Sequence, residues 1–486
     1  MAYRYGDDRD QMVLFPESLD QYVSAEHPVR AYDAFVDSLD FDQLGIALDD
    51  RKVGNSQYDP RLMLKLLLYG YSYGIASSRK LEREGHNNLS FIWLMKNLKP
   101  DHKTIAEFRR KNKTALKNAL KLCARLCLKL GLIQGNVLFV DSTKVRANAG
   151  KKHPHTQKWY QQQLKIVDQR VSRLLTRCES IDAHEAQSES LVKMPKDLAS
   201  QQQLKASIEA ALAELANQSE RTKDGSERKV NRVDPECRQM KSPAGSHPSY
   251  AVQTVVDDKN GLIVQTDAVS DANDSAQLAD QVNAAESNLQ HQSQIICADA
   301  GYNNIDHIEQ VESKQRSVLV PSPQQASDKP IGDFDKSRFV YDPENDCYHC
   351  PQGHRLVFRR YQDKAGKKRD YRIEQPALCR VCCHFGKCTR SAAGRTIVRH
   401  VSELIRQRVA ARYEQPQMRT IYERRKARVE HPFGYMKKVL GFTQFSLRGR
   451  EGARAEASIV ATCFNLTRMV TLLGGVQALV AKLSVA

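Results

Sequence analysis

Long apolar runs are missing from this chain of 486 residues. No uninterrupted apolar stretch reaches the roughly 20 residues that a membrane helix needs, because Lys or Arg breaks the longest ones. The first residues mix charged and aromatic side chains and lack the continuous apolar segment of a secretory signal. These absences argue against a membrane protein and against export, so we expect a cytoplasmic protein.

Acidic residues are too few to balance the basic ones. The chain has 74 Lys and Arg against 57 Asp and Glu, a formal net charge of +17. Self-repulsion of this size does not favour folding, so it points to a polyanionic partner. Nucleic acid fits best, since neutralising phosphates releases bound counterions, although a protein that is merely basic stays the alternative.

Composition divides the chain into helical and mixed parts. We expect an α/β protein in which two insertions interrupt a core built on a mixed sheet. The length of the chain indicates more than one domain. The predicted parts are a helical N-terminal domain at 1–130, core segments at 131–150 and 246–330, a helical insertion at 151–245, a Cys-rich β insertion at 331–400 and a C-terminal core part at 401–486.

Local signals support the helical parts. Asp59 followed by Pro60 is typical of an N-cap and first turn, and it predicts a helix from residue 60. Leu204, Ile208 and Leu215 recur at helical spacing, which indicates a helical hairpin or coiled coil in the first insertion. The cations of 101–113 favour a short DNA-facing helix, and a solvated basic face would look the same.

Two short apolar runs each end in an aspartate. Residues 137–140 precede Asp141, and residues 294–298 precede Asp299, so both acids are expected at the ends of buried strands. Between them, 250–256 and 262–266 form a predicted β-hairpin, because Asn260-Gly261 is a strong turn signal. The core therefore presents two acids from separate strands.

A third acid, Glu430, lies in a helical, strongly basic stretch at 400–438. Each acid alone has an ordinary explanation, a turn or cap for an Asp and an exposed ion pair for the Glu. Together they suit a site for two Mg²⁺ or Mn²⁺ ions, which prefer hard oxygen ligands and assist phosphoryl transfer. We expect Asp141 to bridge the two ions.

Three blocks of sequence carry a resemblance to a known family. They are Val140 to Ala149, Ala298 to Tyr302, and Tyr422 to Lys437, and they resemble the signature blocks of bacterial insertion-sequence DDE transposases. Lys437 lies seven residues after Glu430, as in that family. Arg425 lies five residues before the Glu, where the commonest pattern has four. The likeness covers most of the chain and is weakest in the helical insertion.

The resemblance implies an RNase H-like core, as in retroviral integrases, with the triad Asp141, Asp299 and Glu430. It implies cleavage of the ends of an insertion sequence, joining to target DNA, and an N-terminal domain that binds terminal inverted repeats. The protein would lie on the nucleoid and act as at least a homodimer on DNA. The residues expected to contact DNA are Lys437, Arg425, Arg448, Lys144 and Arg146.

The cysteines form a separate cluster. The pairs Cys347-x₂-Cys350 and Cys379-x₂-Cys382 have the spacing of a structural Zn²⁺ ribbon, and Cys388 lies nearby. The resemblance to related transposases implies a recurring ligand set of Cys350, Cys379, Cys382 and Cys388. The fourth zinc ligand is therefore either Cys347 or Cys388. Reduced cysteines packed in a small β insertion are the alternative.

Two other functions compete with transposition. One is a DNA-binding regulator that keeps the fold without catalysis, although the three acids are intact. The other is an RNase H-like nuclease that only hydrolyses. Some related transposases hold a flipped base on an aromatic residue between the second Asp and the Glu. Trp93 and Trp159 both precede that interval, which leaves Tyr302 or Phe385 for such a role.

Overall fold

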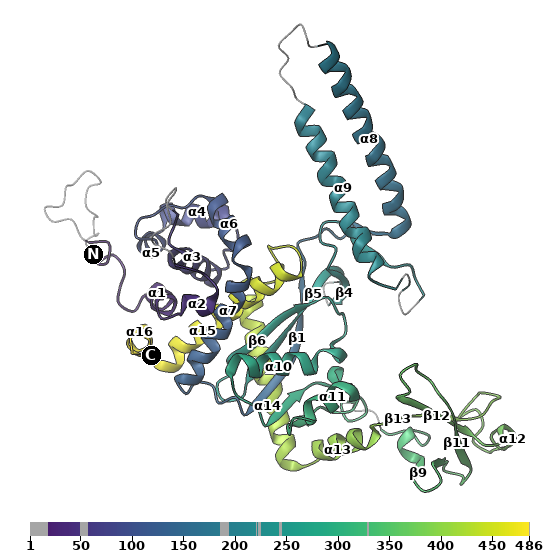
Figure 1. The fold of residues 1–486 in the computed structure, drawn as a ribbon. Helices are drawn as coiled ribbons and strands as arrows, with labels where there is room; N and C mark the ends of the chain where they lie inside the picture. The colour runs from purple at the N-terminus through teal and green to yellow at the C-terminus, as the bar shows by residue number, and fades with distance from the viewer. Residues whose placement is uncertain are drawn as a thin grey trace, which may run out of the picture.

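The computed structural model describes residues 18–48, 57–184, 194–219, 221, 225–242, 245–327 and 330–485. Figure 1 shows a group of N-terminal helices, a central sheet covered by helices, a pair of long helices that projects from the sheet, and a small β-rich lobe at the other end. The two projecting parts are insertions into the central unit.

The N-terminal part is helical. Its helices are α1 (Val29–Asp37), α2 (Phe41–Leu44), α3 (Pro60–Ser72), α4 (Ser78–Asn87), α5 (Leu89–Leu94), α6 (His102–Lys111) and α7 (Lys113–Lys129). The expected start of α3 is confirmed, since Asp59 accepts a hydrogen bond from the backbone N–H of Arg61 at 2.8 Å and Pro60 follows it. The side chain thereby satisfies one of the unpaired amides of the first turn.

The basic segment 101–113 forms α6 and the start of α7, but its cations are not all on the surface. Arg109 is buried, and its Nη1 donates to the hydroxyl of Tyr71 at 3.1 Å and to the carbonyl of Ala76 at 2.6 Å. Arg110 pairs with Glu107. Arg109 therefore joins α6 to α3, so this cation of the predicted DNA-facing helix lies inside the protein.

The central sheet is mixed and six-stranded. Its strands are β1 (Val137–Arg146), β4 (Arg238–Ser242), β5 (Gly245–Asp257), β6 (Ile263–Val269), β7 (Ile295–Ala298) and β8 (Ser317–Leu319). β5 pairs antiparallel with β1, β4 and β6, while β1, β7 and β8 run parallel. The predicted hairpin of β5 and β6 is confirmed. β4 joins this sheet although it falls inside the range expected to be a helical insertion.

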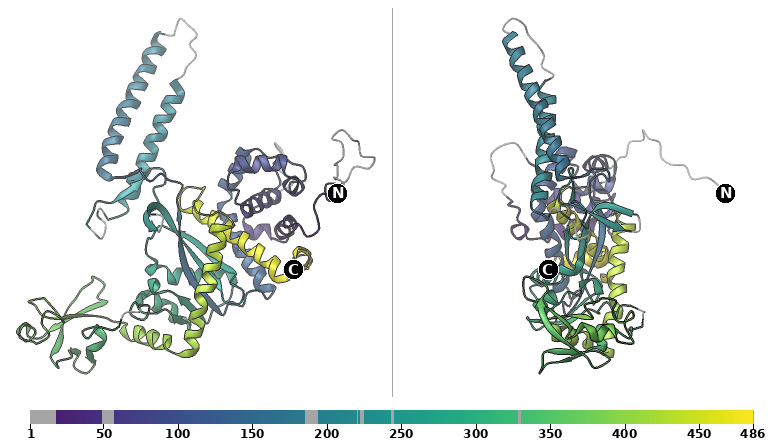
Figure 2. Two further views of the ribbon diagram at one scale, coloured as in Figure 1. Left: turned by 180° about the vertical axis from the view of Figure 1, so that it is seen from behind. Right: turned by 90° about the vertical axis from the view of Figure 1, so that its right-hand side faces the viewer.

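Helices cover both faces of the sheet. They are α10 (Leu278–Leu289), α11 (Ile305–Glu312), α13 (Glu403–Tyr413), α14 (Pro416–Lys438), α15 (Arg450–Leu473) and α16 (Val476–Leu483), with short 3-10 turns η2 (Asp274–Ala276) and η3 (Ala300–Tyr302). α10 lies in front of the sheet in Figure 1, and the view from behind in Figure 2 shows α14 across the opposite face. α14 contacts β1, β5 and β7.

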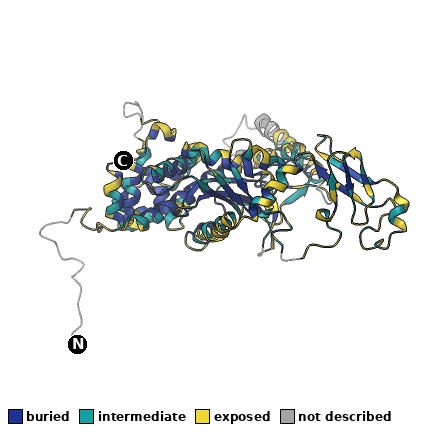
Figure 3. Ribbon diagram, turned by 90° about the horizontal axis from the view of Figure 1, so that it is seen from below, coloured by how far each residue is buried: buried dark blue, intermediate teal, exposed yellow. Residues whose placement is uncertain are grey.

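Helix α15 joins the N-terminal helices to the sheet. It packs against α3 and α7 as well as β6. Its buried Asn465 accepts from the backbone N–H of Ile263 at 2.8 Å and donates to the carbonyl of the same residue at 2.7 Å. Its buried Glu456 accepts from the hydroxyl of Tyr71 and from the amides of Ser446 and Leu447. One hydrophobic core consequently runs from the N-terminal helices into the sheet, as the buried residues in Figure 3 show.

The first insertion is a helical arm, α8 (Gln157–His184) and α9 (Met194–Ala216). The expected apolar stripe is confirmed, because Ile208 and Leu215 lie in a small core that the two helices share. At the base of the arm β2 (Pro154–Thr156) pairs with β3 (Lys229–Asn231). The chain therefore leaves the central unit and returns to it at nearly the same place.

The second insertion is the β-rich lobe. Its sheet contains β9 (Val340–Asp342), β10 (Cys347–His349), β11 (Arg355–Tyr361), β12 (Lys368–Ile373) and β13 (Thr396–His400), with a 3-10 turn η4 (Lys336–Arg338) and the short helix α12 (Pro376–Arg380). It has its own small aromatic core, separate from the main one.

No single described helix is both long and apolar enough to cross a membrane. α15 and α16 reach that length and composition only as a pair, across a bend of 103°.

Candidate active site

Asp141 and Asp299 lie side by side on parallel neighbouring strands. Val140 of β1 is in register with Ala298 of β7, and each acid is the next residue along its strand. β7 ends there, whereas β1 continues beside β5 to Arg146. The expectation that the first strand ends at its acid is therefore wrong, since β5 keeps that strand extended. Beyond Val140, no described strand pairs with β1 on its β7 side, and only Arg146 at its end forms a single parallel bridge there, with Gln444.

Asp141 is surrounded by both favourable and unfavourable charges. Its Oδ2 accepts from Arg425 Nη1 at 2.8 Å, and its Oδ1 accepts from the backbone N–H of Ser142 at 2.7 Å. Burial raises the pKa of Asp141 to about 6; Arg425 and the amide oppose this, and the carboxylates of Asp299 and Asp274 add to it. A carboxylate so placed, with other acids close by, favours a cation.

Asp299 is held by its own backbone. Its Oδ1 accepts from the N–H of Gly301 at 2.8 Å, which caps the turn η3. A Cβ on Gly301 would lie 2.9 Å from that same oxygen, so a glycine two residues after the acid allows the carboxylate to fold over the turn. The cap uses one oxygen, and Oδ2 makes no hydrogen bond or ion pair in the described part of the chain.

Thr254 supplies a polar group that the sequence did not single out. It lies opposite Asp141 in the β1–β5 ladder, and paired residues project to the same face of a sheet. The hydroxyl is fully buried and has no hydrogen-bond partner among the described residues. The signal was available, because Gln253 and Thr254 are the polar pair within the otherwise apolar stretch 251–256.

Glu430 lies on helix α14. It is exposed, and among the described residues it makes no hydrogen bond or ion pair. Two residues later Pro432 lies inside the helix, where it cannot donate to the carbonyl of Arg428. The structure does not bring Glu430 into contact with the two aspartates. Only one trio of possible ligand atoms in the described ranges lies within 4.8 Å of one another, and it lies in the β-rich lobe.

The residues expected to contact DNA fall into different environments. Arg425 is half-buried as the ion-pair partner of Asp141, and its guanidinium lies 5.5 Å from the ring centre of Tyr422. Lys437 is half-buried and donates to Thr143 Oγ1, and burial lowers the pKa of this lysine. Lys144 and Arg146 are exposed on β1 and alternate with Thr143, so they point to the opposite face. Arg448 is exposed beyond α14.

Tyr302 is unavailable as a platform for a flipped base. Its ring is fully buried, and its hydroxyl donates to Gln253 Oε1 at 2.6 Å. Phe385 lies in the β-rich lobe and is 40% exposed. The hypothesis that Tyr302 substitutes for the missing tryptophan is therefore wrong.

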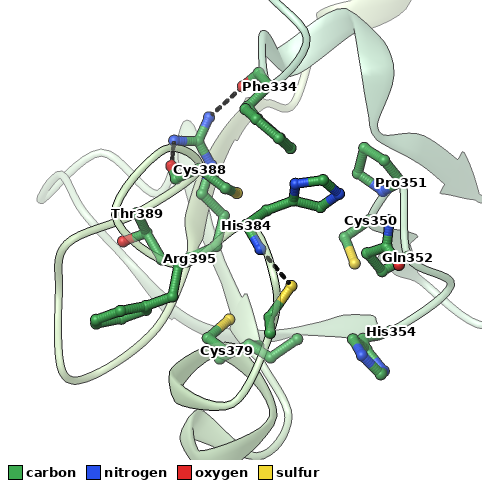
Figure 4. Close-up of a pocket in the computed structure, with 13 residues that line it drawn as sticks. Phe334, Cys350, Pro351, Gln352, His354, Cys379, His384, Cys388, Thr389 and Arg395 are labelled. Atoms are coloured by element: carbon green, nitrogen blue, oxygen red, sulfur yellow. Dashed lines mark hydrogen bonds between the residues drawn. The ribbon is translucent and has the colours of Figure 1, made fainter.

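The β-rich lobe collects four cysteines around one small cavity of about 30 Å³. Cys350, Cys379, Cys382 and Cys388 line it together with His354 and His384, as Figure 4 shows for most of these side chains. Burial raises the pKa of Cys388, and the other three thiols add to the rise. Gly394 permits the close approach, because a Cβ there would lie 2.3 Å from Ile373 and 3.3 Å from the sulfur of Cys379.

Cys347 does not line this cavity. It is fully buried at the start of β10, with its sulfur 3.7 Å from His349 Nε2. With Asp342 these two residues form the trio of possible metal ligands. Cys347 raises the pKa of the exposed Arg355, so a positively charged side chain lies near this trio. The spacing Cys347-x₂-Cys350 therefore does not bring both sulfurs to one site.

Comparison with known proteins gives two family matches. Residues 17–111 match a transposase domain of the DUF772 family, and residues 349–470 match a transposase DDE domain. No curated protein matches the chain. A cryo-EM structure of a piggyBac transposase synaptic complex with hairpin DNA is similar at a TM-score of 0.33 and 9% identity, covering 96% of this chain and 80% of that one.

The matched domains define an enzyme that cuts and transfers DNA. The chain is a DDE-type transposase, and enzymes of this type use divalent metal ions. The DDE match contains Glu430 and Lys437, whereas Asp141 and Asp299 lie before it.

Proposed function

We propose that this transposase cleaves the ends of an insertion sequence and joins them to target DNA through a site made by Asp141, Asp299 and Glu430. The observation that carries the proposal is the pairing of Val140 with Ala298, which puts two acids next to each other where β7 ends. An RNase H-like core agrees with the strand order, in which an antiparallel trio, β6, β5 and β1, continues into parallel β7 and β8.

The donor set fits Mg²⁺ or Mn²⁺. Carboxylates and a threonine hydroxyl are hard oxygen ligands, and Thr254 Oγ1 is a buried oxygen without a partner in the described ranges. Two such ions would neutralise charge on the phosphate and activate the attacking water or 3′ hydroxyl. In this proposal the carboxylates of Asp141, Asp299 and Glu430 would hold these ions.

Helix α14 supplies the third acid and a cation on one stripe. Glu430 and Lys437 are seven residues apart, close to two full turns, so they project from the same side of the helix. Lys437 already reaches Thr143, two residues after Asp141. In this proposal Glu430, on the same side of α14 as Lys437, completes the acid site, Lys437 binds a phosphate and Arg425 holds Asp141 in place.

Exposed cations extend the proposed DNA surface. Arg448, Lys144 and Arg146 are exposed and lie on or next to β1, since Gln444 forms a bridge with Arg146. The net charge of +17 also supports DNA contacts by the N-terminal domain and residence on the nucleoid. Cutting both ends of one element needs two active sites, so we infer at least a homodimer on DNA.

The four cysteines of the lobe cavity are proposed to bind a structural Zn²⁺. The four thiols line one cavity from the end of β10, from α12 and from the loop after it, although no three of their sulfur atoms lie within 4.8 Å of one another in the described ranges. Bound zinc would draw them together into tetrahedral coordination. The set is Cys350, Cys379, Cys382 and Cys388. Zinc there would stabilise a lobe whose own apolar core is small.

The decisive experiment is cleavage and joining of a labelled element-end duplex with Mg²⁺. We expect the wild-type chain to form a joined product and Asp299→Ala to form none. Asp280→Ala is the matched control, because Asp280 is exposed on α10 away from the three acids. DNA binding without any chemistry would favour a regulator, and cleavage without joining would favour a nuclease; either result overturns the proposal.

A further inference from the structure

A buried glutamine lies behind the paired aspartates. Gln253 is fully buried in β5, in register with Ser142, the residue after Asp141. A buried primary amide has to find partners for both its N–H groups and its oxygen, because an unpaired one costs about 1–3 kcal/mol. The oxygen and one N–H group of Gln253 find such partners, in two separate segments of the site.

The amide joins the two turns that follow β6 and β7. Its Nε2 donates to Asp274 Oδ1 at 2.5 Å, and Asp274 begins the turn η2. Its Oε1 accepts from the hydroxyl of Tyr302 at 2.6 Å, and Tyr302 ends the turn η3 that Asp299 caps. These bonds link β5, η2 and η3, and β5 is itself paired with β1, the strand that carries Asp141.

The amide nitrogen of Gln253 donates and its oxygen accepts, so a side chain that lacks either group cannot make both bonds. Asp274 as a carboxylate can only accept, and the Tyr302 hydroxyl donates to Gln253, so the oxygen and the nitrogen of the amide cannot exchange places. η2 and η3 also pack against each other. Buried networks of this kind give a unique arrangement when every member is satisfied.

We propose that Gln253 is a positioning residue of the transposase, which through Tyr302 and Asp274 fixes the turn carrying Asp299 against the strand carrying Asp141. The proposal rests on the proposed function, since it concerns the same metal-binding acids. In it Asp274 serves as a hydrogen-bond acceptor that anchors η2, and its charge is not used to bind the metal ions. Gln253 touches neither metal nor DNA.

The test measures Mn²⁺ binding to the full chain by electron paramagnetic resonance, which needs no catalytic turnover. Gln253→Met keeps the length of the side chain and removes both bonds, and we expect it to weaken Mn²⁺ binding at least fivefold. Tyr302→Phe removes one bond and should weaken binding less. Gln310→Met, at an exposed position on α11, is the control and should bind as the wild type does.

Two variants of Asp274 separate positioning from metal ligation. Asp274→Leu removes the acceptor and should match Gln253→Met. Asp274→Asn keeps an oxygen for Gln253 Nε2, so it should recover most of the lost Mn²⁺ affinity. Equal losses in the Asn and Leu variants would show that the charge itself binds metal, and would overturn the positioning role.

Thermal unfolding of each variant separates local from global effects. If Gln253→Met is too unstable to assay, Tyr302→Phe carries the test, and unchanged Mn²⁺ binding in that variant overturns the inference. Unchanged binding in a folded Gln253→Met chain does so as well. Absence of Mn²⁺ binding in the wild-type chain would overturn the proposed metal site first, and this inference with it.

Discussion

Polar side chains buried in the core carry out tasks that differ from residue to residue. Asp141 tolerates burial next to other acids, which costs stability and prepares a cation site. Asn465 has the opposite effect: its amide pairs with both backbone groups of Ile263, near the irregularity between Val255 and Val256 in the β5–β6 ladder. One residue serves chemistry at the expense of stability, and the other serves only the fold.

Replacing Asn465 should therefore destabilise the protein strongly. Asn465→Leu has nearly the same volume but leaves the N–H and C=O of Ile263 without partners, and each buried unpaired group costs about 1–3 kcal/mol. We expect the free energy of unfolding to fall by about 2–4 kcal/mol in chemical denaturation. Thr471→Leu, at an exposed position of the same helix, should change it by less than about 0.5 kcal/mol. Similar values for the two variants would contradict this role of Asn465.

The sequence identified Asp141 and Asp299 because an apolar run that ends in an acid has a recognisable pattern. It did not identify the partners of those acids. Gln253 was visible as a polar residue in an apolar strand, but its bonds to Asp274 and Tyr302 depend on how three separate segments pack. Arg425 was expected to contact DNA, and only the position of α14 against β1 pairs it with Asp141.

Among the secondary-structure elements, the sequence predicted those strands that are apolar or that border a clear turn signal. β5, β6 and their hairpin follow from β-branched residues around Asn260-Gly261. β4 was not, because Arg238–Ser242 is an edge strand of mostly polar residues that forms only by pairing with the first residues of β5. The polar second half of β1 extends for the same reason.

Zinc binding by the β-rich lobe can be tested apart from catalysis. Cys382→Ser should abolish bound zinc, which is measurable as metal per chain by mass spectrometry, because three thiolates bind Zn²⁺ far less tightly than four. Cys347→Ser is the matched variant. Cys347 belongs to a Cys-x₂-Cys pair, as Cys382 does, but it lies outside the cavity. It should retain one zinc per chain. Loss of zinc in Cys347→Ser with retention in Cys382→Ser would reverse the assignment.

At the scale of the molecule, the parts differ in how they depend on one another. The N-terminal helices and the sheet share one hydrophobic core, whereas the arm and the lobe each have a small core of their own. A boundary near residue 130 is thus a change of architecture within one packed body. Composition revealed where that architecture changes, but it could not reveal that α15 would bury itself between the two halves.

Removing the arm should leave the rest of the chain folded. Thr156 and Lys229 are paired across β2 and β3, so residues 157–228 can be replaced by a two-residue Asn-Gly turn that closes the same antiparallel pair. We expect the melting temperature to change by only a few degrees. Replacing α15 residues 458–466 with a flexible linker is the contrasting variant and should unfold the chain. A large fall in melting temperature after removal of the arm would show that the arm stabilises the core.

The position of α15 in the chain also sets the order of events during synthesis. α3 and α7 are complete more than 300 residues before their partner helix emerges, and contacts between such distant segments form slowly. A nascent chain that has reached Lys438 already contains all three acids, yet the helix that joins its N-terminal half to the sheet has not been made. Nuclease activity should therefore appear only after translation has passed Leu473, so that the polypeptide is unable to cut DNA for most of the time it spends on the ribosome.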